Sequence, residues 1–356
     1  MRRLFGFALL AAFSTVAGAC NRSVGGSGGT MTLNGAGATF PYPLYSKWVA
    51  EYGQREPVRI NYQSIGSGGG IRQITERTVD FGASDAPMTD EQLAKAPGKI
   101  LHIPTTLGAV ALSYNLPEVG SAKLRVSPEA LAGIYLGQIT SWNDPNLVEL
   151  NPGVALPNKP IVVVHRSDGS GTTAVFTDYL SKVSPGWKAK VGSGTSVAWP
   201  AGMGAKGNEG VTGQVKTTPG ALGYLELAYA LQSSLPVMAV RNGAGAFTSP
   251  AIESIGAAAS GAAQAMPDDL RVSIVDAPGA NAYPISSFTY VLLYEAPADR
   301  ARGQALARFL WWAVHDGQRF GPALHYAPLP PAVVAKVEGK LKPLLPPESA
   351  APTPAL

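Results

Sequence analysis

The 356-residue sequence predicts an α/β fold. Short apolar runs with the character of strands alternate along the chain with stretches whose apolar residues recur at helical spacing. Residues 161–164, Ile-Val-Val-Val, are the clearest run typical of a buried strand. Three glycine-rich turns, at residues 35–40, 66–70 and 166–172, each follow a strand-like run and precede a helix-like one. This repeated order favours strand–turn–helix units with largely parallel strands.

The first part of the chain is expected to contain two helices and two strands. An apolar stripe predicts a helix over residues 41–52, with Thr39 as its cap because a threonine hydroxyl can accept a hydrogen bond from the first turn. Alternating apolar residues predict a strand at 58–62, and a second helix is expected after Ser67. Residues 81–84 are typical of a short buried strand.

The rest of the chain continues this alternation. Residues 107–114 predict a strand. Ser127 followed by a proline predicts the start of a helix, since serine caps helices and proline suits their first position. The remaining expected elements are a strand at 161–164, a helix at 175–180, a strand at 290–294 and a helix at 306–314.

The N-terminus has the features of an export signal. Two basic residues precede an apolar run at 4–16 and small residues at 17–19, so residues 1–19 are interpreted as a signal peptide. The apolar run is shorter than the about 20 residues that a membrane-spanning helix needs. Cys20 follows directly, and Ala-Gly-Ala-Cys resembles a bacterial lipobox, so we expect lipidation of Cys20. The alternative is an ordinary signal peptide with an incidental cysteine.

Both ends of the mature chain lack the pattern of a folded core. Residues 20–29 are rich in Gly and Ser and are expected to form a flexible tether. The Pro- and Ala-rich composition that begins at Lys342 predicts a disordered tail over residues 346–356. A single cysteine allows no intramolecular disulfide, so a core of roughly 310 residues must stabilise the fold, in two domains.

The charge of the chain is modest. The formal net charge of +4 includes two arginines of the expected signal peptide, so about +2 remains in the mature chain. No basic run interleaves with aromatic residues, which argues against nucleic-acid binding.

The three glycine-rich turns predict an anion site. A helix N-terminus presents N–H groups without intrahelical partners at the positive end of the helix dipole, which suits it to hold an anion. Four hydroxyl residues occupy expected cap positions, and each alone is expected to cap its helix: Thr39, Ser67, Ser170 and Thr172. Glycines such as Gly171, however, let an anion approach the backbone, which a simple cap does not require.

Arg166 is the candidate cation of this site. It directly follows the strand at 161–164 and precedes a helix start, and its planar guanidinium can grip two oxygens of a phosphate-type anion. Asp168, two residues further on, can pair with it. A structural ion pair and a binding role are compatible, because a carboxylate that holds the guanidinium also preorganises it.

Asp85, which directly follows the strand at 81–84, has two interpretations. A carboxylate repels an anion unless the anion offers it a proton, and phosphate near neutral pH still carries one or two protons, whereas sulfate carries none. Asp85 would then accept a hydrogen bond from phosphate and exclude sulfate, since sites built around a required hydrogen bond reject analogues without it by about 10⁴–10⁵. The other interpretation is that Asp85 caps a helix or turn.

No pattern of catalysis stands out. The four histidines are scattered without metal-ligand spacing, and neither a G-x-S-x-G elbow nor a P-loop occurs. His165 adjoins Arg166 on the strand and is interpreted as structural. A serine nucleophile at Ser67 or Ser170 would lack a base, so we expect no enzyme, metal or cofactor.

Several segments also resemble one protein family. They are residues 35–41, 62–63, 65–67, 79–87, 168–172, 199–200, 204, 206–208, 210, 220–224 and 283–285. The similarity runs in order from about residue 32 to residue 340 without large gaps. The chain thereby resembles the phosphate-binding proteins of bacterial high-affinity phosphate ABC transporters.

This resemblance implies a two-lobed periplasmic-binding-protein fold of type 2, with mixed sheets flanked by helices and a ligand cleft between the lobes. Residues 30–104 and 283–345 would form lobe 1, and residues 105–282 lobe 2. Two features depart from the family: Gly68 stands where a second serine is common, and His165 stands beside the arginine.

The resemblance also implies the ligands of phosphate. Thr39 and Phe40 would bind through backbone N–H groups, and Thr39 also through its hydroxyl. Asp168 would steady Arg166. The full implied set is Thr39, Phe40, Ser67, Asp85, Arg166, Ser170, Gly171 and Thr172.

The implied function is capture of inorganic phosphate by a monomer in the periplasm or at the cell surface, held by lipid on Cys20. The partners would be the permease and ATPase subunits of an ABC transporter. Three alternatives stay open: a phosphatase that uses the same anion cradle, a surface adhesin or interaction protein, and a receptor for a related oxyanion such as arsenate or phosphite.

Overall fold

The computed structural model describes residues 30–347. The expected signal peptide at 1–19, the tether at 20–29 with Cys20, and residues 348–356 of the expected tail lie outside the described residues. Lys342–Leu344 form a short 3-10 helix, so regular structure continues into the Pro- and Ala-rich composition. Within the described part, no helix combines the length and the apolar character needed to cross a membrane.

The strands of the described residues form a large and a small sheet. The strands of the large sheet are β1 (Met31–Gly37), β2 (Val58–Ser64), β3 (Phe81–Ser84), β4 (Ile100–Tyr114), β6 (Val162–Arg166), β7 (Met203–Ala205), β8 (Ala221–Glu226) and β11 (Ser286–Tyr294). Their order in space is β2-β1-β3-β11-β4-β8-β6-β7. The small sheet consists of β5 (Arg125–Val126), β9 (Ala239–Arg241) and β10 (Phe247–Thr248).

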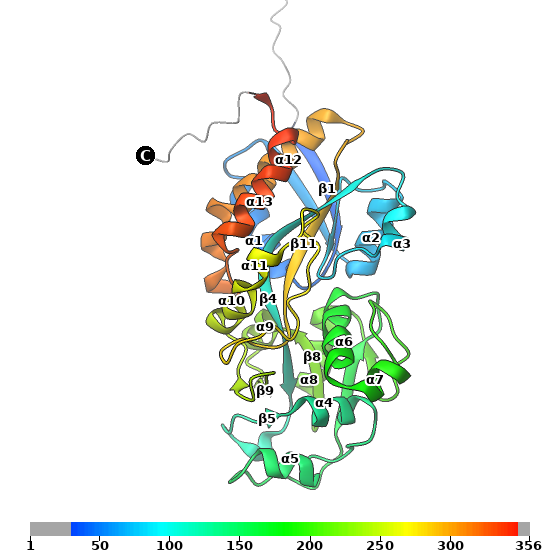
Figure 1. Ribbon diagram of the computed structural model, residues 1–356, viewed down its shortest axis with the longest axis vertical. Coiled ribbons are helices and arrows are strands. Elements are labelled where there is room, and N and C mark those ends of the chain that lie inside the picture. The colour runs from blue at the N-terminus through cyan, green and yellow to red at the C-terminus, as the bar shows by residue number, and fades with distance from the viewer. Residues whose placement is uncertain (1–29, 348–356) are drawn as a thin grey trace, which may run out of the picture. The chain divides into compact units, whose positions relative to one another are not determined.

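Strand β4 joins the two halves of the large sheet (Figure 1). All 15 of its residues are buried, and it pairs antiparallel with β11 up to Ala109 and with β8 from Val110 onward. The pairs β1–β2, β1–β3, β6–β7 and β6–β8 are parallel. The expectation of largely parallel strands is therefore wrong at β4 and β11, because a buried apolar run carries no sign of its direction. The mixed sheets implied by the resemblance are present.

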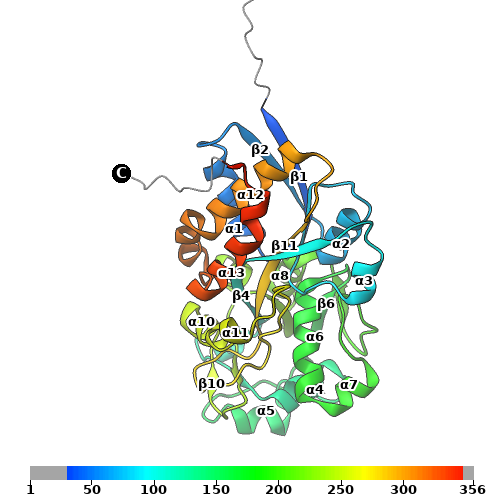
Figure 2. The same ribbon diagram turned by 45° about the horizontal axis from the view of Figure 1, so that its top comes forward.

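Helices cover both faces of this sheet. The α-helices are α1 (Tyr42–Tyr52), α2 (Ser67–Thr75), α3 (Asp90–Ala94), α4 (Pro128–Tyr135), α5 (Pro145–Leu150), α6 (Gly171–Val183), α7 (Pro185–Lys190), α8 (Gly207–Thr217), α9 (Leu227–Gln232), α10 (Ile252–Ser260), α11 (Ala262–Ala265), α12 (Arg300–Val314) and α13 (Pro331–Leu341). Figures 1 and 2 show α1, α12 and α13 on one side of β1 and β11, with α2 and α3 on the other. Short 3-10 helices lie at Pro117–Val119, Asp316–Phe320 and Pro322–Leu324. All the helices expected from apolar stripes are present, as α1, α2, α4, α6 and α12.

Two of the expected helix caps are confirmed. The Ser127 hydroxyl accepts a hydrogen bond from Ala130 N–H at 3.2 Å at the start of α4. The Ser170 hydroxyl accepts one from Thr173 N–H at 3.0 Å at the start of α6. Each bond satisfies one of the N–H groups that a helix start leaves unpaired.

Three other expected caps are wrong. Thr39 does not cap α1, because that helix begins after Pro41. Ser67 is already helical, and the position before it is taken by Gly66, whose φ of 88° suits a glycine. Thr172 lies inside the first turn of α6. The hydroxyls of Thr39, Ser67 and Thr172 are consequently not used to start a helix.

Candidate functional site

Backbone hydrogen bonds join the three glycine-rich turns. The N–H groups of Ile65 and Gly66 donate to Gly37 O at 2.9 and 2.8 Å, and Gly68 N–H donates to Gly169 O at 2.9 Å. The turn after β1 thus lies against the start of α2, which lies against the turn before α6. A Cβ on Gly68 would stand 3.0 Å from Gly169 Cα. Gly68, which stands where a serine was expected from the resemblance, therefore lies at a close backbone contact.

Five buried backbone N–H groups of these turns have no acceptor among residues 30–347. They are the N–H groups of Thr39, Phe40, Ser67, Gly171 and Thr172. A buried N–H without a partner costs about 1–3 kcal/mol, and folded proteins leave very few of them. Five such donors in three adjoining turns therefore indicate that the turns hold an external acceptor.

Three tyrosine hydroxyls orient the first of these turns. Tyr62, Tyr229 and Tyr326 donate at 2.7, 2.6 and 2.6 Å to the carbonyl oxygens of Ala38, Thr39 and Phe40, in that order. In a planar trans peptide the N–H of the next residue points opposite to the carbonyl oxygen. Because Tyr62 and Tyr229 fix two of these carbonyls, the N–H groups of Thr39 and Phe40 are held away from the tyrosines.

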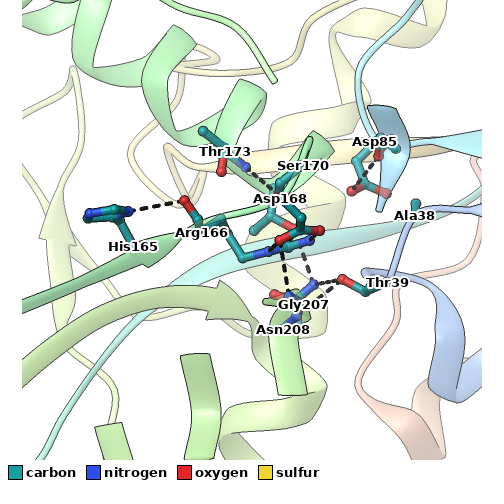
Figure 3. A network of polar contacts seen from close by, with 12 residues as sticks. Ala38, Thr39, Asp85, His165, Arg166, Asp168, Ser170, Thr173, Gly207 and Asn208 are labelled. Carbon is teal, nitrogen blue, oxygen red and sulfur yellow. Dashed lines mark hydrogen bonds and ion pairs between the residues drawn. The ribbon is translucent and has the colours of Figure 1, made fainter. Parts of the chain in front are cut away.

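Arg166 stands at the end of β6 and is held by Asp168 (Figure 3). Its Nε and Nη2 donate to the two carboxylate oxygens at 2.7 and 2.6 Å, and its side chain is 1% exposed. Gly207 N–H also donates to Asp168, at 3.1 Å. Burial opposes ionisation of Asp168, but the hydrogen bonds and charge of Arg166 outweigh it and lower its pKa. The guanidinium keeps further N–H donors for another partner.

The carboxylate of Asp85 is buried beside two hydroxyls. Thr289 Oγ1 donates to its Oδ1 at 2.9 Å, and Ser67 Oγ lies 3.5 Å from its Oδ2. Burial raises the pKa of Asp85 to about 7, although Thr289, Arg166 and Ser67 favour the ionised form. Near neutral pH this group is therefore poised between accepting and donating a hydrogen bond.

Asp85 does not act as a cap. The turn that follows it is closed by the Ser84 hydroxyl, which donates to Ala86 O. Its Oδ2 instead faces the start of α6, since a Cβ on Gly171 would stand 2.5 Å from that oxygen. The carboxylate thus lies between two of the three turns.

His165 is packed into the fold. Its ring stacks on Trp199 with centroids 4.9 Å apart, and its Nδ1 lies 3.0 Å from Arg166 O. No hydrogen bond in the described chain joins a histidine to Ser67 or Ser170. Over residues 30–347 there is also no group of three or more His, Cys, Asp or Glu side chains placed to hold a metal ion.

The structure brings all eight expected ligand residues to the junction of the three turns, and all eight are buried. A cavity of about 160 Å³ adjoins this junction and reaches Thr39, Asp168 and Gly207. The donors outnumber the acceptors, and Asp85 adds one carboxylate that can accept. Such an arrangement can enclose a small oxyanion and hydrogen-bond one of its protons.

Sequence reasoning missed several partners of this site. Asn208, in the first turn of α8, donates to Thr39 (Figure 3). It also donates to Thr172. Thr289 and Tyr229 reach the site from β11 and α9. Of these residues, only Asn208 could have been noticed in the sequence, because it belongs to a segment, 206–208, that carries the resemblance. A polar side chain on an apolar strand or helix face otherwise gives no sign of a distant partner.

Comparisons with known proteins identify the family of this chain. A model of the PBP superfamily domain matches residues 23–316. The phosphate-binding protein PstS of Xylella fastidiosa (strain Temecula1 / ATCC 700964) is 46% identical over 309 residues, which cover 87% of this chain and 84% of that protein. PstS of Pasteurella multocida (strain Pm70) is 44% identical over 312 residues, covering 88% and 90%.

A solved structure shows the same fold. The phosphate-binding protein from Stenotrophomonas maltophilia aligns with a TM-score of 0.67 at 19% identity, covering 87% of this chain and 93% of that one. The fold is thus the two-lobed one with mixed sheets, flanking helices and a cleft between the lobes. The chain belongs to the PBP superfamily and, within it, to the PstS family of phosphate-binding proteins.

Proposed function

We propose that this chain captures inorganic phosphate in the cleft between its lobes and delivers it to the permease of an ABC transporter. The observation that carries the proposal is the group of five buried N–H donors beside Arg166 that have no acceptor among residues 30–347, with the carboxylate of Asp85 facing Gly171 among them. Phosphate supplies the four oxygens that such donors need and a proton for the carboxylate. Membership of the PstS family, whose relatives are named phosphate-binding proteins, supports the same ligand.

The proposed ligands divide by chemistry. Backbone N–H groups, hydroxyls and the guanidinium donate to phosphate oxygens, and Asp168 steadies Arg166. Asp85 accepts a hydrogen bond from protonated phosphate and thereby excludes sulfate. The proposed set is Thr39, Phe40, Ser67, Asp85, Arg166, Ser170, Gly171 and Thr172.

We propose that lobe 1 comprises residues 30–104 and 283–345, and lobe 2 residues 105–282. The role of β4 supports this division, since its two ends pair with different strands and it passes from one half of the sheet to the other. The contact between Gly68 and Gly169 would then close the cleft. Closure removes water and strengthens each charge-assisted hydrogen bond.

The cellular setting is part of the same proposal. The chain would be exported as a monomer to the periplasm or the cell surface, with lipid on Cys20 as its anchor, and would carry out no catalysis. The permease and ATPase subunits of a phosphate ABC transporter would be its partners. Mass spectrometry of the mature protein tests the anchor, because unmodified Cys20 would contradict it.

Calorimetry on the purified mature chain tests the central claim. Phosphate should bind with 1:1 stoichiometry, and sulfate at the same concentration should give no heat. A chromogenic phosphate ester should stay intact, whereas its hydrolysis would favour a phosphatase. Failure of phosphate to bind would refute the proposed function.

A further inference from the structure

A buried amide outside the proposed ligand set joins two of its members. Asn208 is the second residue of α8 and is fully buried. Its Nδ2 lies 2.7 Å from Thr39 Oγ1 and 3.2 Å from Thr172 Oγ1. Its backbone N–H lies a further 3.2 Å from Thr39 Oγ1. One residue therefore supplies three donors to two hydroxyl oxygens.

The orientation of this amide follows from its other partner. Asn208 Oδ1 accepts a hydrogen bond from the backbone N–H of Glu226 at 2.9 Å. A backbone N–H can only donate, so the oxygen of the amide must face Glu226 and the nitrogen must face the two threonines. Both N–H bonds of Nδ2 are then used, one on each hydroxyl.

The hydroxyl of Thr39 has no free lone pair left. A hydroxyl oxygen can accept two hydrogen bonds and donate one. Both acceptor positions of Thr39 Oγ1 are filled by Asn208, through its backbone and its side chain. No acceptor among the described residues takes the proton of this hydroxyl. The proton is therefore available only to something else in the cleft.

The hydroxyl of Thr172 is in the same state. Its oxygen accepts from Asn208 Nδ2 at 3.2 Å and from Arg166 Nη1 at 3.4 Å. Its proton, too, has no acceptor within residues 30–347. Two rotating hydroxyls, which could each have accepted or donated, are thus both left as donors.

The contacts of Asn208 also cross the cleft. Thr39 follows β1, whereas α8 packs on β6 and β8 in the other half of the sheet. The hydrogen bonds from Asn208 to Thr39 can form only when these halves approach each other. The orientation of the Thr39 hydroxyl is therefore fixed only in the closed state. Tyr229, from the same half as Asn208, holds the Thr39 carbonyl at 2.6 Å.

We propose that Asn208 is a positioning residue for the anion: by filling the lone pairs of Thr39 and Thr172 in the closed cleft, it commits both hydroxyls to donate to bound phosphate. This role rests on the proposed function. The oxygens of phosphate and of sulfate both accept hydrogen bonds from these hydroxyls, so Asn208 acts on affinity rather than on the choice between the two anions.

A double-mutant cycle tests the role. Asn208→Ala should weaken phosphate binding about 10- to 100-fold, since hydrogen bonds to a charged group are at stake. In the background of Thr39→Val with Thr172→Val, the same change should weaken binding less than about threefold, because no hydroxyl remains to be oriented. Gln214→Ala, which removes an amide from the same helix, should leave affinity unchanged and serves as the matched control.

The outcomes separate the two proposals. Equal effects of Asn208→Ala in both backgrounds would overturn the positioning role and leave phosphate binding intact as the function. No phosphate binding by the unmodified chain would overturn both. If Asn208→Ala does not fold, Asn208→Asp is used: it keeps the acceptor for Glu226 but turns both hydroxyls toward itself, so it should weaken phosphate at least as much. Undiminished affinity of folded Asn208→Asp would contradict the proposal.

Discussion

Replacing Asp85 by Asn tests whether this carboxylate responds to a proton on the anion. Thr289 Oγ1 donates to Asp85 Oδ1 at 2.9 Å, and that bond is retained if the Asn oxygen takes the same place. The Asn Nδ2 then stands where Oδ2 was, facing Ser67 and Gly171. The Oδ2 position, which could accept a hydrogen bond, then holds an NH₂ group that can only donate one. The shape of the side chain changes little.

The size of the effect follows from the environment of Asp85. Burial raises its pKa from 3.8 to about 7. That shift corresponds to an ionised form disfavoured by about 4 kcal/mol. A phosphate hydroxyl relieves this penalty by donating to the carboxylate, whereas sulfate adds a second unpaired negative charge. A site of this kind discriminates by about 10⁴–10⁵, and Asp85→Asn should reduce the phosphate-to-sulfate ratio to about 10² or less.

Competition calorimetry at pH 8, where Asp85 is ionised in the free closed cleft, measures both affinities. Phosphate should lose about tenfold, the value of one charge-assisted hydrogen bond. Sulfate binding should become measurable. Asp316→Asn changes an exposed carboxylate at the surface and should alter neither affinity. If Asp85→Asn still ignores sulfate, the proton-reading role is refuted.

Three other changes have expected outcomes. Arg166→Ala leaves Asp168 without its buried partner and should weaken phosphate binding by about 10³-fold in calorimetry; unchanged affinity would remove Arg166 from the site. Gly171→Ala would place a Cβ 2.4 Å from Ser67 Oγ and 2.5 Å from Asp85 Oδ2; it should abolish binding while the ligand-free thermal midpoint shifts only slightly, and normal binding would argue against a closed cleft here. Because the pKa of Asp85 in the folded protein is raised, its contribution to the free energy of unfolding is full below about pH 4 and is lost as pH rises to about 7. Without ligand, the thermal midpoint of Asp85→Asn should therefore rise relative to that of the unmodified protein across this pH range. A difference between the two midpoints that does not change with pH would count against a buried, neutral Asp85.

Local patterns predicted much of the fold. Residues 81–84 were expected as a buried strand, and β3 occupies those positions. Ser127 before a proline marked the start of α4, because both residue types act within one turn of their position. The start of β4 at Ile100 was missed because Pro104 and polar residues interrupt its apolar run, although every residue there is buried. Burial of polar residues depends on distant strands, which local pattern cannot register.

The residues of the candidate site likewise fall into those that local sequence predicts and those that it does not. The glycine turns and Arg166 could be identified because strand, turn and helix lie next to one another in sequence. Asn208 acts on Thr39 across 169 positions, and Thr289 acts on Asp85 across 204. Tyr229 looks like any core tyrosine until its hydroxyl is seen on Thr39 O. Residues that position the expected ligand residues through such distant hydrogen bonds can therefore be identified only from the tertiary structure.

The charges in the site bear on how it would select its anion. The buried Arg166 and the half-buried Asp168 form an ion pair whose charges cancel, and an ionised Asp85 leaves a negative balance. Attraction for an anion must then come from oriented N–H and O–H dipoles, which are strong only at short range and in a dry interior. A patch of unpaired basic side chains would collect phosphate and sulfate alike. Oriented donors around one acceptor instead require an anion oxygen at each donor and a proton at Asp85. The hydroxyl protons of Thr39 and Thr172, in the orientation proposed for Asn208, would add to the affinity, whereas Asp85 would supply the selectivity.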